Sequence, residues 1–136
     1  MIIVRRHIGF VIRCVLKSEF AILFSGLFSE KAMDFVAKVM DRIPNISVIT
    51  EIEALSWVSA DKSKEAIVKA FIEDVNILPL SPDVVAKCVK IRRSRKIKPP
   101  DSIIAATAII HNLTLITSDK DFNNIQGIKT INPDEL

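Results

Sequence analysis

Short apolar, β-rich runs alternate with helical patterns along this chain, and this alternation limits the possible folds more than any other feature. The runs are predicted around Ile8–Leu16 and at residues 46–50, 75–80, 113–117 and 128–132, and helical spacing of apolar residues separates the first four. Strands that are joined through helices are typical of an α/β domain with a mostly parallel sheet. We therefore expect an α/β fold with four to five strands.

Local signals place the helices between these runs. Ser29 is the predicted N-cap of a helix over residues 29–43, and Ser81-Pro82-Asp83 begins another helix that continues into a basic stretch. Pro99-Pro100 is predicted to end that helix, and Asp101 to open the next, which closes at His111-Asn112. The apolar stripe of the first helix contains Ala32, Phe35, Val36, Val39 and Met40.

The composition indicates one folded domain over residues 1–136. Of the 136 residues, 49% are hydrophobic and 26% are charged, which excludes a disordered or fibrous protein. Cys14 and Cys88 match neither a disulfide framework nor a zinc site, so a reducing, cytoplasmic compartment is expected. The apolar stretch Phe20–Phe28 is shorter than the roughly 20 residues that span a bilayer. A buried strand and helix explain this region better than a signal peptide or membrane anchor.

Acidic residues gather where predicted strands end. Glu51 and Glu53 follow the run at residues 46–50, and Asp119 and Asp121 follow the run at residues 113–117. Asp101 opens the helix that leads into the latter run. The carboxyl ends of parallel strands share one edge of a sheet, so these acids are expected to lie close together. Carboxylates suit Mg²⁺ or Mn²⁺, and the chain has no glycine-rich phosphate loop that would indicate a nucleotide-binding fold.

Each of these acids also has a purely structural interpretation. Asp101 could cap its helix, which would contribute roughly 0.5–2 kcal/mol, and Glu53 could interact with a helix dipole. Asp119 and Asp121 could be ordinary turn residues. The metal hypothesis therefore depends on the acids converging in space.

A basic run lies just before Asp101. The sequence KCVKIRRSRKIK, residues 87–98, contains seven basic residues and no acid. Such a run is either a solvated helix face or a surface that approaches nucleic-acid phosphates. The run alone leaves both interpretations open.

Three segments together resemble the PIN domain, and within it the VapC-type toxins of bacterial toxin–antitoxin pairs. They are ISVITEIEALSW, KPPDSIIAATAIIHNLTLITSDKDF and IKTINP, and the resemblance covers about residues 29–133. It implies a three-layer α/β/α fold and an endoribonuclease that depends on Mg²⁺ or Mn²⁺. It also implies an RNA substrate, a cognate antitoxin and a homodimer.

The resemblance assigns roles to individual residues. It implies that Glu53, Asp101 and Asp119 are catalytic and bind the metal, together with Asp121. Thr50 and Thr117 would support the site. The basic residues that would face RNA are Lys90, Arg92, Arg93, Arg95 and Lys96.

The chain departs from the family before residue 25. The family's first strand leads into Asp-Thr-Asn or Asp-Thr-Ser, where this sequence has Leu16-Lys17-Ser18, and residues 1–18 contain no acid. Three explanations compete: a degenerate member, compensation by Glu19, or a frameshift in the gene. The alternative to an enzyme is a catalytically inactive PIN fold that binds RNA or a protein. A purely structural α/β protein would require the acid pattern to be a coincidence.

Overall fold

A five-stranded parallel sheet organises the computed structural model, which describes residues 10–12 and 29–136. The sheet has the order β3-β2-β1-β4-β5, and each neighbouring pair is parallel. This confirms the predicted α/β class and the number of strands. The strands are β1 (Phe10–Ile12), β2 (Asn45–Ser47), β3 (Asn76–Leu78), β4 (Thr114–Ile116) and β5 (Lys129–Ile131).

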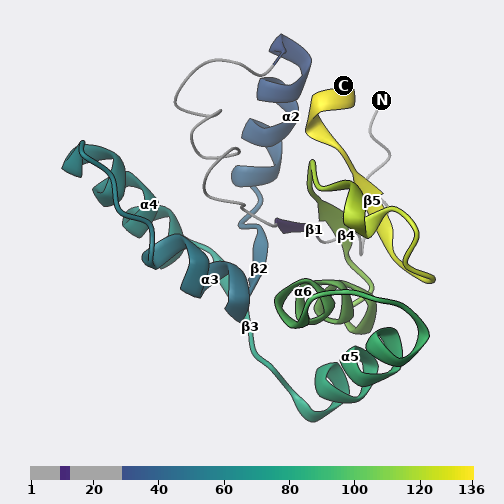
Figure 1. The fold of residues 1–136 in the computed structure, drawn as a ribbon. Coiled ribbons are helices and arrows are strands. Elements are labelled where there is room, and N and C mark those ends of the chain that lie inside the picture. The colour runs from purple at the N-terminus through teal and green to yellow at the C-terminus, as the bar shows by residue number, and fades with distance from the viewer. Residues whose placement is uncertain (1–9, 13–28) are drawn as a thin grey trace.

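Helices connect the strands and build the outer layers (Figure 1). Parallel strands joined by right-handed crossovers place helices on opposite faces when the direction of strand addition reverses. Here the direction reverses between β3 and β4, and Figure 1 shows α2 on the opposite side of the sheet from α5 and α6. The helices are α2 (Glu30–Met40), α3 (Val48–Leu55), α4 (Lys62–Asp74), α5 (Pro82–Ser94) and α6 (Pro99–Ile110), with short 3₁₀ helices η1 (Lys120–Phe122) and η2 (Pro133–Glu135).

The predicted helix signals are confirmed at several ends. The Ser29 hydroxyl accepts a hydrogen bond from the Ala32 N–H at 3.1 Å, and the Ser81 hydroxyl accepts one from the Val84 N–H at 3.3 Å. His111 is the C-cap of α6, and Asn112 follows with a φ of 51°. That left-handed conformation is one that Asn adopts more readily than most residues, which explains the end of the helix here.

Two predicted boundaries are wrong. The strand predicted over residues 46–50 ends at Ser47, because the Ser47 hydroxyl caps a helix that begins at Val48. The helix predicted to end at Pro99-Pro100 ends at Ser94, and the two prolines form the first turn of α6 instead. Proline at the start of a helix is favourable, since its missing N–H would have no intrahelical partner there.

Two apolar clusters hold the layers together. The first joins α5, α6, β4 and η1, and it contains Val84, Ile91, Ile104, Ala105, Ala106, Ala108, Leu115, Phe122 and Ile125. The alanines of α6 are almost fully buried, so this helix lies close to its neighbours. The second cluster, formed by Ile46, Ala54, Val68 and Ile72, joins β2, α3 and α4 and has Trp57 packed against it. Within the described residues, no helix has the length and apolar character needed to cross a membrane.

Ser47→Ala tests the boundary between β2 and α3. The buried Ser47 hydroxyl accepts from the Thr50 N–H at 3.2 Å and also pairs with the Thr50 hydroxyl at 3.4 Å. Its loss leaves buried polar groups unsatisfied and is expected to lower the free energy of unfolding by about 1–2 kcal/mol in urea denaturation. The exposed Ser56→Ala is the control, with a change within about 0.5 kcal/mol. Equal stability of both variants would contradict this role of Ser47.

A candidate metal centre at the carboxyl end of β4

A tight turn after β4 presents two carboxylates. Thr117 is buried, and its Oγ1 accepts a hydrogen bond from the Asp119 N–H at 3.1 Å. The Asp119 Oδ1 in turn accepts from the Asp121 N–H at 2.9 Å and caps η1. The fully buried Phe122 anchors this short helix in the first apolar cluster. The Thr-x-Asp-x-Asp-Phe pattern therefore encodes a local structure that fixes both aspartates.

Asp101 approaches the same place from α6. It lies in the first turn after Pro99 and Pro100, and only 6% of its surface is exposed. The N-cap is Lys98, which makes no side-chain capping bond, so Asp101 is not the N-cap residue itself but an acid in the first turn. The two prolines lack N–H groups, which leaves fewer donors for a cap to satisfy. The positive end of the helix dipole still favours a carboxylate at this position.

Asp101, Asp119 and Asp121 converge. One carboxylate oxygen from each lies within 4.8 Å of the others, and the three residues are respectively buried, half-buried and exposed. Negative charges at such short separations repel one another, and solvent weakens this repulsion most at the exposed Asp121. A cation between the oxygens would convert this repulsion into attraction. Among the described residues, the donors of this group are all hard carboxylate oxygens, which suit Mg²⁺ or Mn²⁺ better than zinc.

The group lies at the place where the strand order changes direction. β1 is the central strand, with β2 and β3 on one side and β4 and β5 on the other. In open parallel sheets, ligands bind beyond the carboxyl ends of the strands at this point, because the connections diverge to opposite faces. Asp119 follows β4 directly and stands at this position. Residues 13–28, which follow β1 and include Glu19, lie outside the described part of the chain.

Glu53 and Thr50 lie on α3, outside the three-aspartate group. The strand ends earlier than predicted, so Glu53 is in the second turn of α3, and it is half-buried with one buried carboxylate oxygen. The helix α3 packs against α6, which carries Asp101. Thr50 is fully buried and pairs with Ser47, so its hydroxyl supports α3. The metal-binding role of Glu53 stays a prediction.

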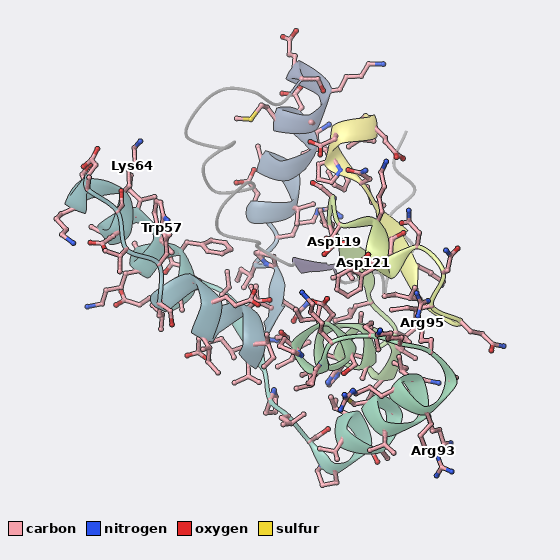
Figure 2. The ribbon with its side chains drawn as sticks, viewed as in Figure 1. Trp57, Lys64, Arg93, Arg95, Asp119 and Asp121 are labelled. Atoms are coloured by element: carbon pink, nitrogen blue, oxygen red, sulfur yellow. The ribbon has the colours of Figure 1, made fainter. Side chains whose placement is uncertain are left out.

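Arg95 of the basic run contacts this site. The Nη2 of Arg95 donates to the Asp121 backbone oxygen at 3.5 Å, and Figure 2 shows Arg95 next to Asp119 and Asp121. Arg93 points away from the two aspartates in the same view. Lys96 is exposed in the segment between α5 and α6, while Lys90 and Arg92 lie on α5. Arg95 and Arg93 therefore point in different directions, and the RNA-facing role of the five residues stays a prediction.

Sequence reasoning missed the residues that face α5 across this surface. Asn124, Gln126 and Gly127 line a cleft together with Lys87, Lys90 and Arg95. They belong to the connection between η1 and β5, a segment that carries no periodic pattern. Their position just after Asp-Phe was the one local signal that could have indicated a role near the site.

A model of the PIN domain family matches residues 21–128 of the chain. The chain belongs to the PIN domain family. The comparison of folds agrees: a toxin–antitoxin complex from Klebsiella pneumoniae contains a chain with 29% identity and a TM-score of 0.65, covering 92% of this chain and 98% of that one. The predicted membership is thereby confirmed. No curated protein matched the sequence.

Two further PIN-like structures share the fold at lower identity. One is VapBC2 from Rickettsia felis bound to a promoter DNA fragment, with 18% identity, a TM-score of 0.68 and coverage of 92% and 98% of the two chains. The other is VapBC-1 from nontypeable Haemophilus influenzae, with 18% identity, a TM-score of 0.67 and coverage of 93% and 98%. These likenesses support the three-layer α/β/α architecture, which is the predicted one.

Neutralising one of the converging acids tests whether they repel. Asp119→Asn keeps the oxygen that accepts from the Asp121 N–H and removes one negative charge. In EDTA, the variant is expected to be more stable than the wild type by on the order of 1 kcal/mol, with a melting temperature a few degrees higher. Added Mn²⁺ should stabilise the wild type more than the variant, because a ligand of the native state raises stability.

The exposed Asp134→Asn on η2 is the matched control for this charge change. Differential scanning calorimetry should show it unchanged in EDTA and as responsive to Mn²⁺ as the wild type. A lower melting temperature of Asp119→Asn in EDTA would contradict the repulsion between the aspartates.

Proposed function

We propose that this protein is a divalent-metal-dependent endoribonuclease of the PIN toxin type. The observation that supports this most is the convergence of Asp101, Asp119 and Asp121 at the carboxyl end of β4 in a chain of the PIN family. Three carboxylates whose oxygens lie within a few ångströms of one another can act together as ligands of a cation. In a purely structural protein, their mutual repulsion would only be destabilising. Glu53 is proposed as a further acid of the site.

The described residues can perform distinct tasks in phosphodiester hydrolysis. When bound, Mg²⁺ or Mn²⁺ supplies the charge that lowers the pKa of a water and steadies negative charge on the phosphate. Asp101, Asp119 and Asp121 would hold the ion, and Thr117 fixes the turn that orients Asp119. Arg95, whose guanidinium lies beside Asp121, would attract the RNA backbone toward these acids.

The partners and the setting of the enzyme belong to the same proposal. The similar structures include toxin–antitoxin complexes, which supports a cognate antitoxin that binds this chain. We also propose that the protein forms a homodimer and is located in the cytoplasm. The antitoxin would end cleavage by covering the acids or by displacing the RNA.

One sequence observation favours a second candidate, a catalytically inactive PIN fold that binds RNA or a protein. Residues 1–18 contain no acid where the family motif has one. A site with fewer carboxylates binds a divalent cation less tightly. Calorimetric titration with Mn²⁺ distinguishes the two candidates, because tight binding that depends on Asp101 supports the enzyme and its absence supports the binding module.

Cleavage of RNA is the direct test of the proposed activity. The full chain is incubated with an unstructured RNA that carries a fluorophore and a quencher, in Mg²⁺ or Mn²⁺. We expect cleavage that EDTA abolishes and that Asp101→Asn reduces by at least about 100-fold, because the variant keeps the shape of the side chain and loses its charge. Asp101→Ala should lose activity as well.

The control for loss of a negative charge elsewhere is Asp134→Asn, purified by the same procedure as the Asp101 variants and expected to cleave like the wild type. Equal cleavage by the wild type and both Asp101 variants would exclude this site as the source of activity.

A further inference from the structure

The two sides of α5 line two different surfaces. Residues 87, 90, 91, 94 and 95 follow helical spacing of three and four and line a cleft of about 680 Å³ with the loop at residues 124–127. Residues 85, 88, 89, 92 and 93 follow the same spacing on the other side and line a pocket of about 430 Å³ with Leu80 and Ile103. The basic run, continuous in sequence, is therefore divided in space.

The first of these surfaces, here called the basic cleft, combines three cations with neutral hydrogen-bonding groups. Lys87, Lys90 and Arg95 line it, and the walls also contain Ser94, Asn124 and Gln126. The buried side chains of Ile91 and Ile125 form its apolar part. Among the residues that the structure describes, no acid lines this cleft. The second surface is mostly apolar, with Leu80, Val85 and Val89 beside Arg92 and Arg93.

The cations of the basic cleft are not neutralised within the described part of the chain. Neither Lys87 nor Lys90 forms an ion pair there, whereas Lys62 pairs with Glu65 at 2.9 Å on α4. Arg95 donates to the Asp121 backbone oxygen through Nη2, while its buried Nε–H has no acceptor among the described residues. A buried donor without an acceptor is unfavourable, so the cleft favours an anion that brings acceptors to the guanidinium.

The basic cleft adjoins the aspartate group at Arg95. Arg95 belongs to the cleft and contacts Asp121, one of the three converging acids. A chain of phosphates that enters the acid site would therefore continue along α5 past Arg95 toward Lys90 and Lys87, which lie one and two turns earlier in the helix. Gly127, with a φ of +87°, shapes the opposite wall in a conformation that favours glycine.

We propose that the basic cleft binds the phosphates of RNA next to the cleaved bond, through Lys87, Lys90 and Arg95, and that Arg92 and Arg93 take no part in this binding. The proposal deepens the proposed function in that it takes RNA as the polymer. It narrows the sequence-based expectation for the basic run at residues 87–98, which named Arg92 and Arg93 among the RNA-facing residues. Asn124 and Gln126 contribute hydrogen bonds to the same segment of RNA.

Fluorescence anisotropy with a labelled 12-nucleotide unstructured RNA tests this assignment. Measurements in EDTA separate binding from any metal-dependent cleavage. Lys87→Glu/Lys90→Glu is expected to weaken binding at least tenfold and to lower the dependence of log K on log salt by about 1–2, because two phosphate contacts are lost. Lys87→Ala/Lys90→Ala should also weaken binding, by a smaller factor. This result would show that repulsion between RNA and the introduced glutamates is not the sole cause of the weaker binding.

Two matched variants carry the same change of charge elsewhere. Lys38→Glu/Lys69→Glu, on exposed positions of α2 and α4, should reduce binding by less than about threefold through net charge alone. Arg92→Glu/Arg93→Glu should resemble this control. Circular dichroism and melting temperatures verify that all variants are folded.

The outcomes separate this inference from the proposed activity. Suppose that the wild type cleaves RNA in Mn²⁺ and that Lys87→Glu/Lys90→Glu binds RNA as tightly as the wild type. This result would overturn the proposed RNA binding in the basic cleft without contradicting the proposed nuclease activity. A loss of affinity in Arg92→Glu/Arg93→Glu as large as in the lysine variant would also overturn it. Selective loss in the lysine variant supports the cleft even if no cleavage is detected.

Discussion

The convergence of three carboxylates from two separate elements is the constraint around which the described part of this fold is arranged. Oxygens of Asp101, Asp119 and Asp121 lie within 4.8 Å of one another, and no single segment of chain holds them there. Asp101 is carried by α6, and the other two follow β4. Both elements share the first apolar cluster, where Ile104, Leu115 and Phe122 are fully buried. Burial of these side chains offsets the electrostatic cost of bringing the acids together.

The parallel sheet gives this arrangement its position. Because α6 leads into β4, the start of α6 and the carboxyl end of β4 lie at the same edge of the sheet, which is where a helix antiparallel to its strand must begin. β4 also neighbours the central strand β1, across which the order of strand addition reverses. The acid group therefore stands where connections diverge and leave room for a ligand. The position of the site follows from the topology of the sheet. Local hydrogen bonds, such as the one that the Asp119 N–H donates to Thr117 Oγ1, fix the orientation of its side chains.

The sequence predicted those features that depend on short-range signals. Strand order along the chain, the caps at Ser29 and Ser81, and the convergence of acids after strands follow from periodicity, capping chemistry and the geometry of parallel sheets. Two predicted element boundaries were wrong because the same local sequence signal is compatible with two different structures. Val48, Ile49 and Thr50 favour a strand by propensity, yet Ser47 caps them into a helix, and Pro99-Pro100 suits both the end and the start of a helix. The division of α5 could not be predicted, since it depends on contacts with residues 124–127, far along the chain.

The proximity of acids and bases gives the proposed chemistry a physical logic. RNA carries one negative charge per phosphate, so an isolated cluster of three aspartates would repel the substrate that it is meant to cleave. In the proposed enzyme, two sources of positive charge would reverse this. Arg95 and the lysines of α5 would attract the flanking phosphates, and a divalent cation held by the aspartates would attract the phosphate at the site. In the proposed enzyme, the metal ion would thus assist the approach of the phosphate to the aspartates as well as the reaction.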